Sequence, residues 1–482
     1  MSHVIVVVLI GVRILSVTAT SADEAYCYSL DENRTQWGHF ATRTAYEVVR
    51  DSSSSRNYFE ADCIPTKYWL LVRHGTRLHG TKYINFLPRS LNKLRDAILA
   101  NNDSRKVICS DDLALLRHWR WDSNMTTDYE GFLTESGWNE LKNLATREKT
   151  RFGALFHGPY RKDRFHFRYT NTQRTVASFR AFAEGLFGDG AYARVYAEGE
   201  PTRDTLLKPH FFCPDYDENK SKIRGPGSEQ DKFMQSALFQ QTIADISTRL
   251  GFPYNLTLDQ IEDMWDHCRF EQAWYLPQLS PWCSVFTKEQ INVLEYKEDL
   301  RYYYQSGHGY ARAGDLACFT MADMMRHLGQ AGGEPSIIAY FCHESIIQLF
   351  LVALGAKKDP NPLRSDNYEA MRNRQFRSSE WTPFAANVAA VRYQCNDVVS
   401  PVKIKFFLNE KVLMFDWCER GSCDWDEVQR SPGRLPESCL GGVTDRQLES
   451  QSKGRQCESR GGWKLRCKKR FGLSHRFKPS ET

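Results

Sequence analysis

Short apolar runs alternate with amphipathic stretches along most of the chain, which is typical of proteins that mix strands and helices. Three apolar runs, at 68–72, 165–170 and 337–341, have the length and the β-branched or aromatic content of buried strands. Helical stretches follow the second and third runs, at 172–185 and 345–354. We therefore expect an α/β fold in which helices flank a central, mainly parallel sheet.

Two other parts of the chain have a different pattern. From about 215 to 300 the sequence is rich in Gln, Asp and Leu with few β-branched runs, which predicts a helical insertion that forms a second, smaller domain. After about 430 it is rich in Gly, Ser and Arg and has no clear apolar period. We expect one large folded region over 27–430, with its α/β core at about 60–210 and 300–430, and a basic, Cys-containing tail at 431–482.

The first residues of the chain predict export. An apolar run from Val4 to Val12 precedes the small residues 19–22, which is the shape of a signal peptide over 1–22. Arg13 interrupts the apolar stretch, so a retained N-terminal anchor is the alternative. The C-terminus lacks a Lys-Asp-Glu-Leu-like retention signal, which favours secretion over residence in the lumen of the endoplasmic reticulum.

Cysteines and glycosylation sequons agree with a secretory route. The chain has 14 cysteines, and disulfides persist in oxidising compartments. Asn-x-Ser/Thr sequons begin at Asn33, Asn102, Asn124, Asn219 and Asn255. We therefore expect a disulfide-bonded glycoprotein.

Composition and charge exclude several classes of protein. Of 482 residues, 41% are apolar and 26% charged, which is ordinary for a globular protein and argues against global disorder or a membrane bundle. The net charge is +5, but residues 453–482 hold ten Lys/Arg against two Asp/Glu. The rest of the chain is therefore slightly acidic. Because the basic tail has few aromatic residues and no known nucleic-acid motif, we expect no nucleic-acid partner.

Polar residues suited to an anion follow each predicted strand. The three clusters are Arg73, His74 and Arg77; Asn171, Gln173 and Arg174; and His343 and Glu344. In open parallel sheets, ligands bind at the carboxyl ends of the strands, where helix N-termini also favour negative charge. One pocket could therefore hold all three clusters.

These residue types match the needs of phosphoryl transfer. Arginines offer forked, permanently charged donors for phosphate oxygens, and an imidazole can accept the phosphoryl group and later release it to water. A carboxylic acid can protonate the departing oxygen, and Glu344 is the only acid in the three clusters. Taken singly, Arg174 is more often a salt-bridged residue and His343 a buried polar one. The combination and its placement favour a phosphate site.

The segment Arg73-His74-Gly75-Thr76-Arg77 resembles the Arg-His-Gly-x-Arg signature of the histidine acid phosphatases. Within that family the chain is most similar to the multiple inositol polyphosphate phosphatases, a phytase-like group. The resemblance covers roughly 63–425. Its supporting segments are 133–137, 169–175 with Ser178 and Phe179, 206–207 before Phe212-Cys213, and 298–300 through 307–309.

This resemblance implies a fold, a reaction and a set of roles. The family fold is an α/β sheet with a helical domain beside it and the substrate in between. His74 would be the phosphorylated nucleophile, and Glu344 the proton donor. Family members need no metal or other cofactor, and they remove phosphate from inositol hexakisphosphate, from lower inositol phosphates and from 2,3-bisphosphoglycerate. The phosphate-binding side chains would be Arg73, Arg77, Arg174 and His343.

The third cluster departs from the closest group. Multiple inositol polyphosphate phosphatases often have His-Ala-Glu there, whereas this chain has His343-Glu344 without a spacer, like the His-Asp of other histidine acid phosphatases. The donor role of Glu344 is therefore less firmly implied than the role of His74. Because a displacement of about 1 Å can slow a reaction roughly a hundredfold, reduced turnover is one outcome of this change.

Three disulfides are candidates. Similar enzymes join the regions of Cys63 and Cys395, and Cys268–Cys283 and Cys418–Cys423 are local pairs. Cys342, beside the third cluster, is expected to be a packed free thiol.

Two other hypotheses remain beside an inositol polyphosphate phosphatase. One is an acid phosphatase of the same family that acts on simple phosphomonoesters or lysophosphatidic acid. The other is a weakly active secreted protein that binds inositol phosphates, for which the altered third cluster and the basic tail are the motivation.

Overall fold

A computed structural model describes residues 26–52, 60–333, 335–397 and 399–430, and the backbone of 456–459 and 465–468. The predicted signal peptide over 1–22 and most of the tail over 431–482 lie outside the described residues. Where the tail is described, strands β8 (Gln456–Ser459) and β9 (Leu465–Lys468) pair antiparallel. No helix among the described residues has the length and apolar character that a membrane span requires.

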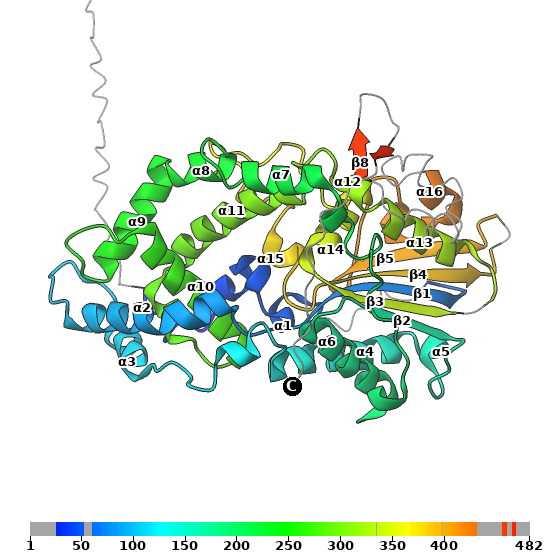
Figure 1. The fold of residues 1–482 in the computed structure, drawn as a ribbon, viewed down its shortest axis with the longest axis horizontal. Helices are drawn as coiled ribbons and strands as arrows, with labels where there is room; N and C mark the ends of the chain where they lie inside the picture. The colour runs from blue at the N-terminus through cyan, green and yellow to red at the C-terminus, as the bar shows by residue number, and fades with distance from the viewer. Residues whose placement is uncertain are drawn as a thin grey trace, which may run out of the picture.

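One central sheet organises the molecule (Figure 1). Its strand order is β2-β3-β1-β4-β5-β6, and β7 pairs with β5. The strands are β1 (Cys63–Arg73), β2 (Phe165–Tyr169), β3 (Ile337–Cys342), β4 (Asn387–Cys395), β5 (Val402–Leu408), β6 (Lys411–Val412) and β7 (Cys423–Asp424). The expected α/β class is confirmed.

The sheet is mixed rather than mainly parallel. The three predicted strands β1, β2 and β3 are neighbours and run parallel, whereas β4, β5, β6 and β7 each pair antiparallel. Asn409 and Glu410 explain part of this difference. Both have positive φ angles in the tight turn between β5 and β6, and a turn of that length can only join antiparallel strands.

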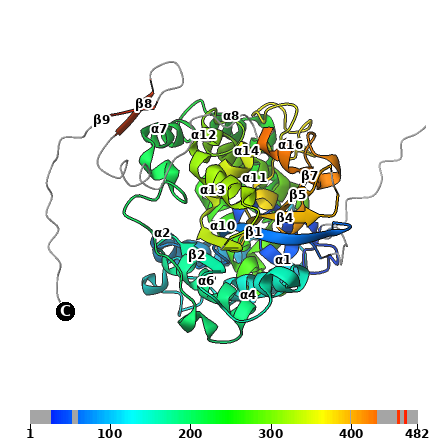
Figure 2. The same cartoon turned by 90° about the vertical axis from the view of Figure 1, so that its right-hand side faces the viewer.

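Helices cover both faces of the sheet (Figures 1 and 2). On one face, Tyr68, Leu70 and Val72 of β1 join a core with apolar side chains of α4 (Glu135–Arg151), α5 (Gly153–Phe156) and α6 (Gln173–Phe187). On the other face, Trp69 and Leu71 join a core with α13 (Cys318–Gly329) and α14 (Glu344–Ala353). Burying each large apolar side chain contributes about 1.5–3 kcal/mol, so both faces hold β1 in place.

A group of helices, called the helical side below, lies next to one end of the central sheet (Figure 1). The helices of the predicted insertion are α7 (Pro214–Lys222), α8 (Glu229–Met234), α9 (Ala237–Arg249), α10 (Leu258–Tyr275) and α11 (Lys288–Gln305). The earlier helices α2 (Thr81–Ala100) and α3 (Ser110–His118) join them, and Leu87 and Leu91 of α2 share a core with Trp265 of α10. The helical side thus draws on two separate stretches of the chain. Its long helices start sharply, since α10 and α11 both begin with capping boxes.

Four disulfides join two described cysteines each. Three are the predicted pairs Cys63–Cys395, Cys268–Cys283 and Cys418–Cys423. The fourth, Cys27–Cys109, was not predicted, because connectivity does not follow from sequence spacing.

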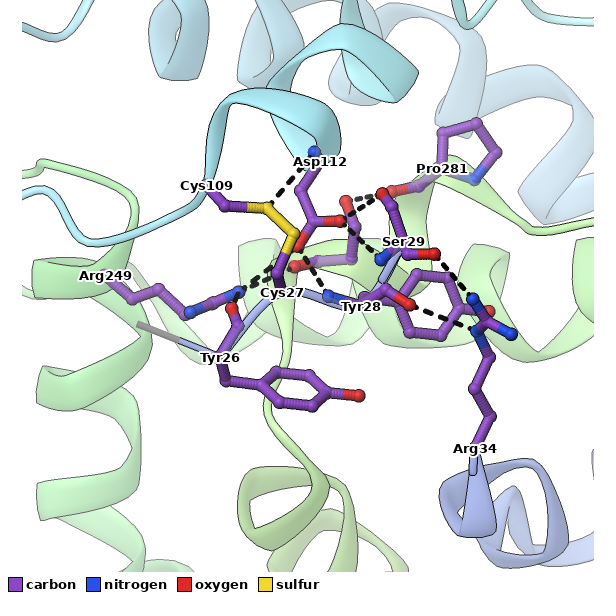
Figure 3. Close-up of a disulfide and its surroundings, with 10 residues drawn as sticks. Tyr26, Cys27, Tyr28, Ser29, Arg34, Cys109, Asp112, Arg249 and Pro281 are labelled. Carbon is purple, nitrogen blue, oxygen red and sulfur yellow. Dashed lines mark hydrogen bonds and ion pairs between the residues drawn. A yellow bond between two sulfur atoms is a disulfide. The ribbon is translucent and has the colours of Figure 1, made fainter. Parts of the chain in front are cut away.

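The Cys27–Cys109 disulfide ties the N-terminal segment, residues 26–46, to helix α3 (Figure 3). The Asp112 carboxylate accepts hydrogen bonds from the backbone N–H groups of Tyr28, at 2.9 Å, and Ser29, at 2.8 Å. Arg34 donates to the carbonyl oxygens of the same two residues, at 3.1 and 2.7 Å. The segment then continues through η1 (Thr35–His39) and η2 (Ala41–Arg43).

Candidate active site

The three predicted clusters meet at one edge of the sheet. Arg73 at the end of β1 lies beside Cys342 at the end of β3, and Phe341 pairs with both Val72 and Tyr169. Backbone hydrogen bonds continue this order past the strands, because the N–H of His74 donates to the carbonyl of Cys342 at 3.1 Å. The side chains that follow the strands are therefore placed by the backbone of the sheet.

His74 is a buried, neutral imidazole with a defined tautomer. Its side chain is 1% exposed, and its Nδ1 lies 2.8 Å from the carbonyl oxygen of Gly75. A carbonyl only accepts, so Nδ1 carries the hydrogen and Nε2 keeps its lone pair. Burial, together with the charges of Arg73 and Arg174, holds the pKa of His74 well below its ordinary value. The imidazole can therefore act as a nucleophile at neutral and acidic pH.

Close packing against α4 holds the loop after His74. A Cβ atom on Gly75 would lie 2.4 Å from the carbonyl oxygen of Gly137, and one on Gly137 would lie 2.2 Å from the carbonyl oxygen of Thr76. Thr134, the N-cap of α4, donates from its backbone N–H to that same oxygen at 2.9 Å. Any side chain at either glycine would push the loop out of place.

Glu140 of α4 is a buried acid that supports the same loop. Its carboxylate accepts hydrogen bonds from the N–H of Thr76 at 2.7 Å and from the Thr76 hydroxyl at 2.8 Å. Burial raises the pKa of Glu140 to about 7, although the bonds from Thr76 oppose the shift. Glu140 thus fixes the residue that lies between Gly75 and Arg77.

Three arginines from the predicted clusters surround His74. Arg73 is 1% exposed and donates from Nη1 to the carbonyl oxygens of Thr42 at 2.6 Å and Thr382 at 2.7 Å. Arg77 lies against the ring of Phe270, with 5.3 Å between its guanidinium carbon and the ring centre. Arg174 lies in the first turn of α6.

The arginines of the site repel one another. Burial lowers the pKa of Arg73 to about 10, with Glu344 opposing the shift and the nearby arginines adding to it. Burial, followed by neighbouring arginine charges, also holds the pKa of Arg77 well below its ordinary value. A site in which cations destabilise each other gains free energy when an anion binds.

His343 and Glu344 begin helix α14, with His343 at the N-cap. The Nε2 of His343 lies 3.1 Å from the Thr170 hydroxyl, and its ring meets the ring of His74 edge to face at 5.5 Å. Burial and the charge of Arg174 lower the pKa of His343 to about 3, so this imidazole is neutral as well.

Glu344 is half-buried and lies 3.8 Å from Nε of Arg73. Burial alone would raise the pKa of its carboxyl, but Arg73 and a further arginine, Arg43, outweigh burial and hold that pKa below its ordinary value. Glu344 is therefore ionised at neutral pH.

Anions suit this site better than metal ions do. One nitrogen from each of His74 and His343 and one oxygen of Glu344 lie within 4.8 Å of one another, and by type these atoms could ligate a metal. The surrounding guanidiniums would repel a cation, and the Nδ1 of His74 is already bound to Gly75. A second group of ligand-type residues among the described residues, near Asp111, includes Cys27 and Cys109, whose sulfurs form a disulfide.

Not every residue of the predicted clusters faces the site. Gln173 is exposed, and its side-chain oxygen accepts a hydrogen bond from the N–H of Leu133 at 2.9 Å. Asn171 is also exposed, and its backbone N–H donates to the carboxylate of Glu200 at 2.8 Å. Of the second cluster, only Arg174 contributes charge next to His74.

Sequence analysis missed Arg43, Phe270 and Glu140. Arg43 follows no strand, and Phe270 is one of many aromatic residues in a helical stretch, so neither carried a local signal. Glu140 lies one helical turn after Gly137 within a segment that the family resemblance had already marked, which was the available signal.

Comparisons with known proteins agree on one family. Residues 67–409 match the family described as Histidine phosphatase superfamily (branch 2). Multiple inositol polyphosphate phosphatase 1 of Drosophila melanogaster is 39% identical over 426 residues, which cover 87% of this chain and 90% of that relative. The protein of the same name from Homo sapiens is 28% identical, with coverage of 83% and 87%.

Solved structures agree with the fold. The phytase from D. castellii superimposes with a TM-score of 0.66 at 17% identity, over 85% of both chains. A multiple inositol polyphosphate phosphatase from Bifidobacterium longum superimposes with a TM-score of 0.60 at 13% identity, over 81% of this chain and 96% of that one.

Proposed function

Because this chain belongs to the histidine phosphatase superfamily, branch 2, we propose that it removes phosphate from inositol polyphosphates through a phosphohistidine intermediate. One observation carries this proposal: a neutral His74 with an unprotonated Nε2 lies among arginines at the ends of three parallel strands. The fly and human relatives named above support the substrate class, because both are multiple inositol polyphosphate phosphatases.

The first step transfers the phosphoryl group to His74. The Nε2 lone pair attacks the phosphorus in line, a nitrogen–phosphorus bond forms and the ester oxygen departs with the bonding electrons. Arg73, Arg77, Arg174 and His343 bind the phosphoryl oxygens. Because Arg73 is already fixed by two backbone carbonyls, its guanidinium needs little reorganisation as charge moves onto those oxygens.

Glu344 supplies the proton for the departing oxygen. Before substrate binds, its carboxyl is ionised because Arg73 and Arg43 lower its pKa. A phosphate dianion bound to the same arginines neutralises their charge and adds a like charge beside Glu344, and both effects raise that pKa. Substrate binding thus favours the protonated form that the reaction needs, and Glu344 recovers its proton from the water that hydrolyses the phosphohistidine.

A secretory location fits the same chain. The described residues form disulfides that an oxidising compartment preserves. The sequon residues Asn33, Asn102, Asn124 and Asn255 are exposed and accessible to glycosylation. Asn219 differs, because it is half-buried and its side-chain amide donates to the Tyr304 carbonyl at 2.8 Å.

The direct test measures inorganic phosphate released from inositol hexakisphosphate by the purified protein, between about pH 4 and 8 without added metal. We expect release by the wild type and a loss of roughly 10⁴-fold or more in His74→Ala. Thermal unfolding of His74→Ala provides the control for folding. A folded wild type that hydrolyses only a simple monoester, or a His74→Ala protein with full activity, would contradict the proposal.

A further inference from the structure

Arg43 is a cation of the N-terminal segment that reaches the proposed phosphate site from the helical side. Its guanidinium carbon lies 5.1 Å from the centre of the Phe270 ring, and Arg77 lies 5.3 Å from the centre of that same ring. Among charged neighbours, Arg43 lowers the pKa of Arg77 the most, and it lowers the pKa of Glu344 more than any neighbour except Arg73. Arg43 therefore lies beside the reacting groups although it belongs to none of the strand ends.

Within the described part of the chain, Arg43 has no carboxylate at ion-pair distance. Its Nη1 donates to the Thr42 hydroxyl at 2.7 Å, whereas its buried Nε has no hydrogen-bond partner. Two other arginines nearby differ in this respect, because Arg269 pairs with Asp266 and Glu298, and Arg301 pairs with Glu298. A half-buried guanidinium without a counter-charge costs free energy that a bound anion would recover.

Thr42 fixes the spacing between Arg43 and the site. Its carbonyl accepts a hydrogen bond from Arg73 at 2.6 Å, and its hydroxyl lies 3.1 Å from the hydroxyl of Tyr302. Arg301 donates to that same Tyr302 hydroxyl at 2.7 Å. The residue before Arg43 is thus bound to the arginine that carries the reacting phosphate. Thr42 therefore holds both guanidiniums beside the site, where a ligand with more than one anionic group could contact both of them.

The charges of the pocket also favour a ligand of this kind. Four guanidiniums lie around Glu344, whose carboxyl is neutral when it donates its proton. Two other carboxylates are near, but Glu130 beside Arg174 is exposed to solvent, and Glu298 near Arg43 is already paired with three other cations. A single phosphate group carries about two negative charges and leaves about two positive charges uncompensated. A second phosphate group on the same molecule would balance them.

We propose that Arg43 binds a second phosphate group of the substrate, on a carbon next to the one that reacts, and so selects polyphosphorylated substrates over monoesters. This inference rests on the proposed function and names the part of the site that sets its specificity. Arg43 and Arg77 both contact the ring of Phe270, which keeps the two guanidiniums close enough to bind neighbouring phosphates of one inositol ring.

The test compares kcat/KM for inositol hexakisphosphate with kcat/KM for para-nitrophenyl phosphate. We expect Arg43→Met, which keeps the apolar stem on Phe270 and removes the charge, to lower the ratio of the two values roughly 10- to 100-fold. Arg43→Lys keeps a charge and should restore part of the ratio. Arg50→Met is the matched control, because Arg50 lies just after the same segment and pairs with Glu47.

An unchanged ratio of the two kcat/KM values in Arg43→Met would overturn the inference. If that ratio is unchanged because kcat/KM falls equally for both substrates, Arg43 would be a ligand of the phosphate that is transferred. A wild type that fails to hydrolyse inositol hexakisphosphate would instead count against the proposed function. In that case the Arg43 inference is tested by inhibition of monoester hydrolysis. Inositol hexakissulfate, but not inorganic sulfate, should lose roughly tenfold in affinity in Arg43→Met.

Discussion

The two walls of the site are built in different ways. The sheet wall consists of Arg73, His74, His343 and Glu344, which follow neighbouring parallel strands and are held by backbone hydrogen bonds. The helical wall consists of Arg43 and the ring of Phe270 in α10, and contacts between side chains hold it. Backbone hydrogen bonds fix atoms where the reaction needs them, whereas a wall of packed side chains can change with the substrate. We therefore expect changes in the sheet wall to alter turnover of every substrate, and changes in the helical wall to alter the preference among substrates.

After His74→Ala, the largest effect in the sheet wall is expected from Glu344→Gln. Loss of the proposed proton donor should lower kcat for inositol hexakisphosphate by roughly 10²- to 10⁴-fold. The loss should be smaller for para-nitrophenyl phosphate, whose leaving group departs without a proton. Since the pKa of Glu344 is held below its ordinary value in the free protein, wild-type kcat/KM should rise as the pH falls. A pH profile that keeps this slope in Glu344→Gln would assign the donor role to another group.

Glu140→Gln should have the next largest effect. Above about pH 7, where Glu140 is ionised, both carboxylate oxygens accept from Thr76, whereas an amide offers only one acceptor oxygen. The loop between Gly75 and Arg77 should then shift in the variant, and kcat should fall roughly tenfold with both substrates. Because the folded-state pKa of about 7 lies above the usual 4.5, the stabilising effect of Glu140 is complete below about pH 4.5 and is lost as the pH rises through 7. Wild-type thermal stability should therefore decrease from about pH 5 to about pH 8 more steeply than that of the variant. A loss confined to inositol hexakisphosphate would place Glu140 with the helical wall instead.

Phe270→Leu should affect the helical wall with a smaller loss. Without the ring, Arg43 and Arg77 each lose a contact of about 0.5–2 kcal/mol, and KM for inositol hexakisphosphate should rise several-fold more than KM for a monoester. Steady-state kinetics with both substrates measure this difference. Phe384→Leu is the matched change in the sheet wall, because the Phe384 ring lies 4.8 Å from Arg73, and it should reduce activity toward both substrates alike.

The smallest effect on activity is expected from the disulfides. Replacing either Cys27–Cys109 or Cys63–Cys395 with a pair of alanines should lower the free energy of unfolding by about 2–5 kcal/mol. Only the first pair anchors the segment that carries Arg43, so only its removal should shift the substrate ratio, by roughly two- to threefold. Denaturant unfolding and the two kcat/KM values provide both measurements. Equal ratios in the two variants would show that the contacts of Arg43 with Thr42 and Phe270 position it without the disulfide.

The two walls also differ in how far the sequence predicts them. All three strands, both following helices and the cluster around His74 follow from local pattern, because burial on two faces requires continuous apolar runs and the strand ends fix what comes next. Arg43 and Phe270 are separated by more than two hundred residues and meet only through packing of the helical side. Nothing in either local sequence encodes that contact. The inward direction of Arg174 and the outward direction of Gln173 likewise depend on the tertiary environment.

Cys342 is a free thiol next to the site that is protected from oxidation and alkylation. This thiol immediately precedes His343, has no exposed surface, and donates to the carbonyl of Val72 at 3.3 Å. Burial raises its pKa well above the ordinary value, so the reactive thiolate does not form. Oxidants and alkylating reagents therefore do not react at the end of the strand that leads into His343 and Glu344, and no reducing partner is needed to keep Cys342 as a thiol.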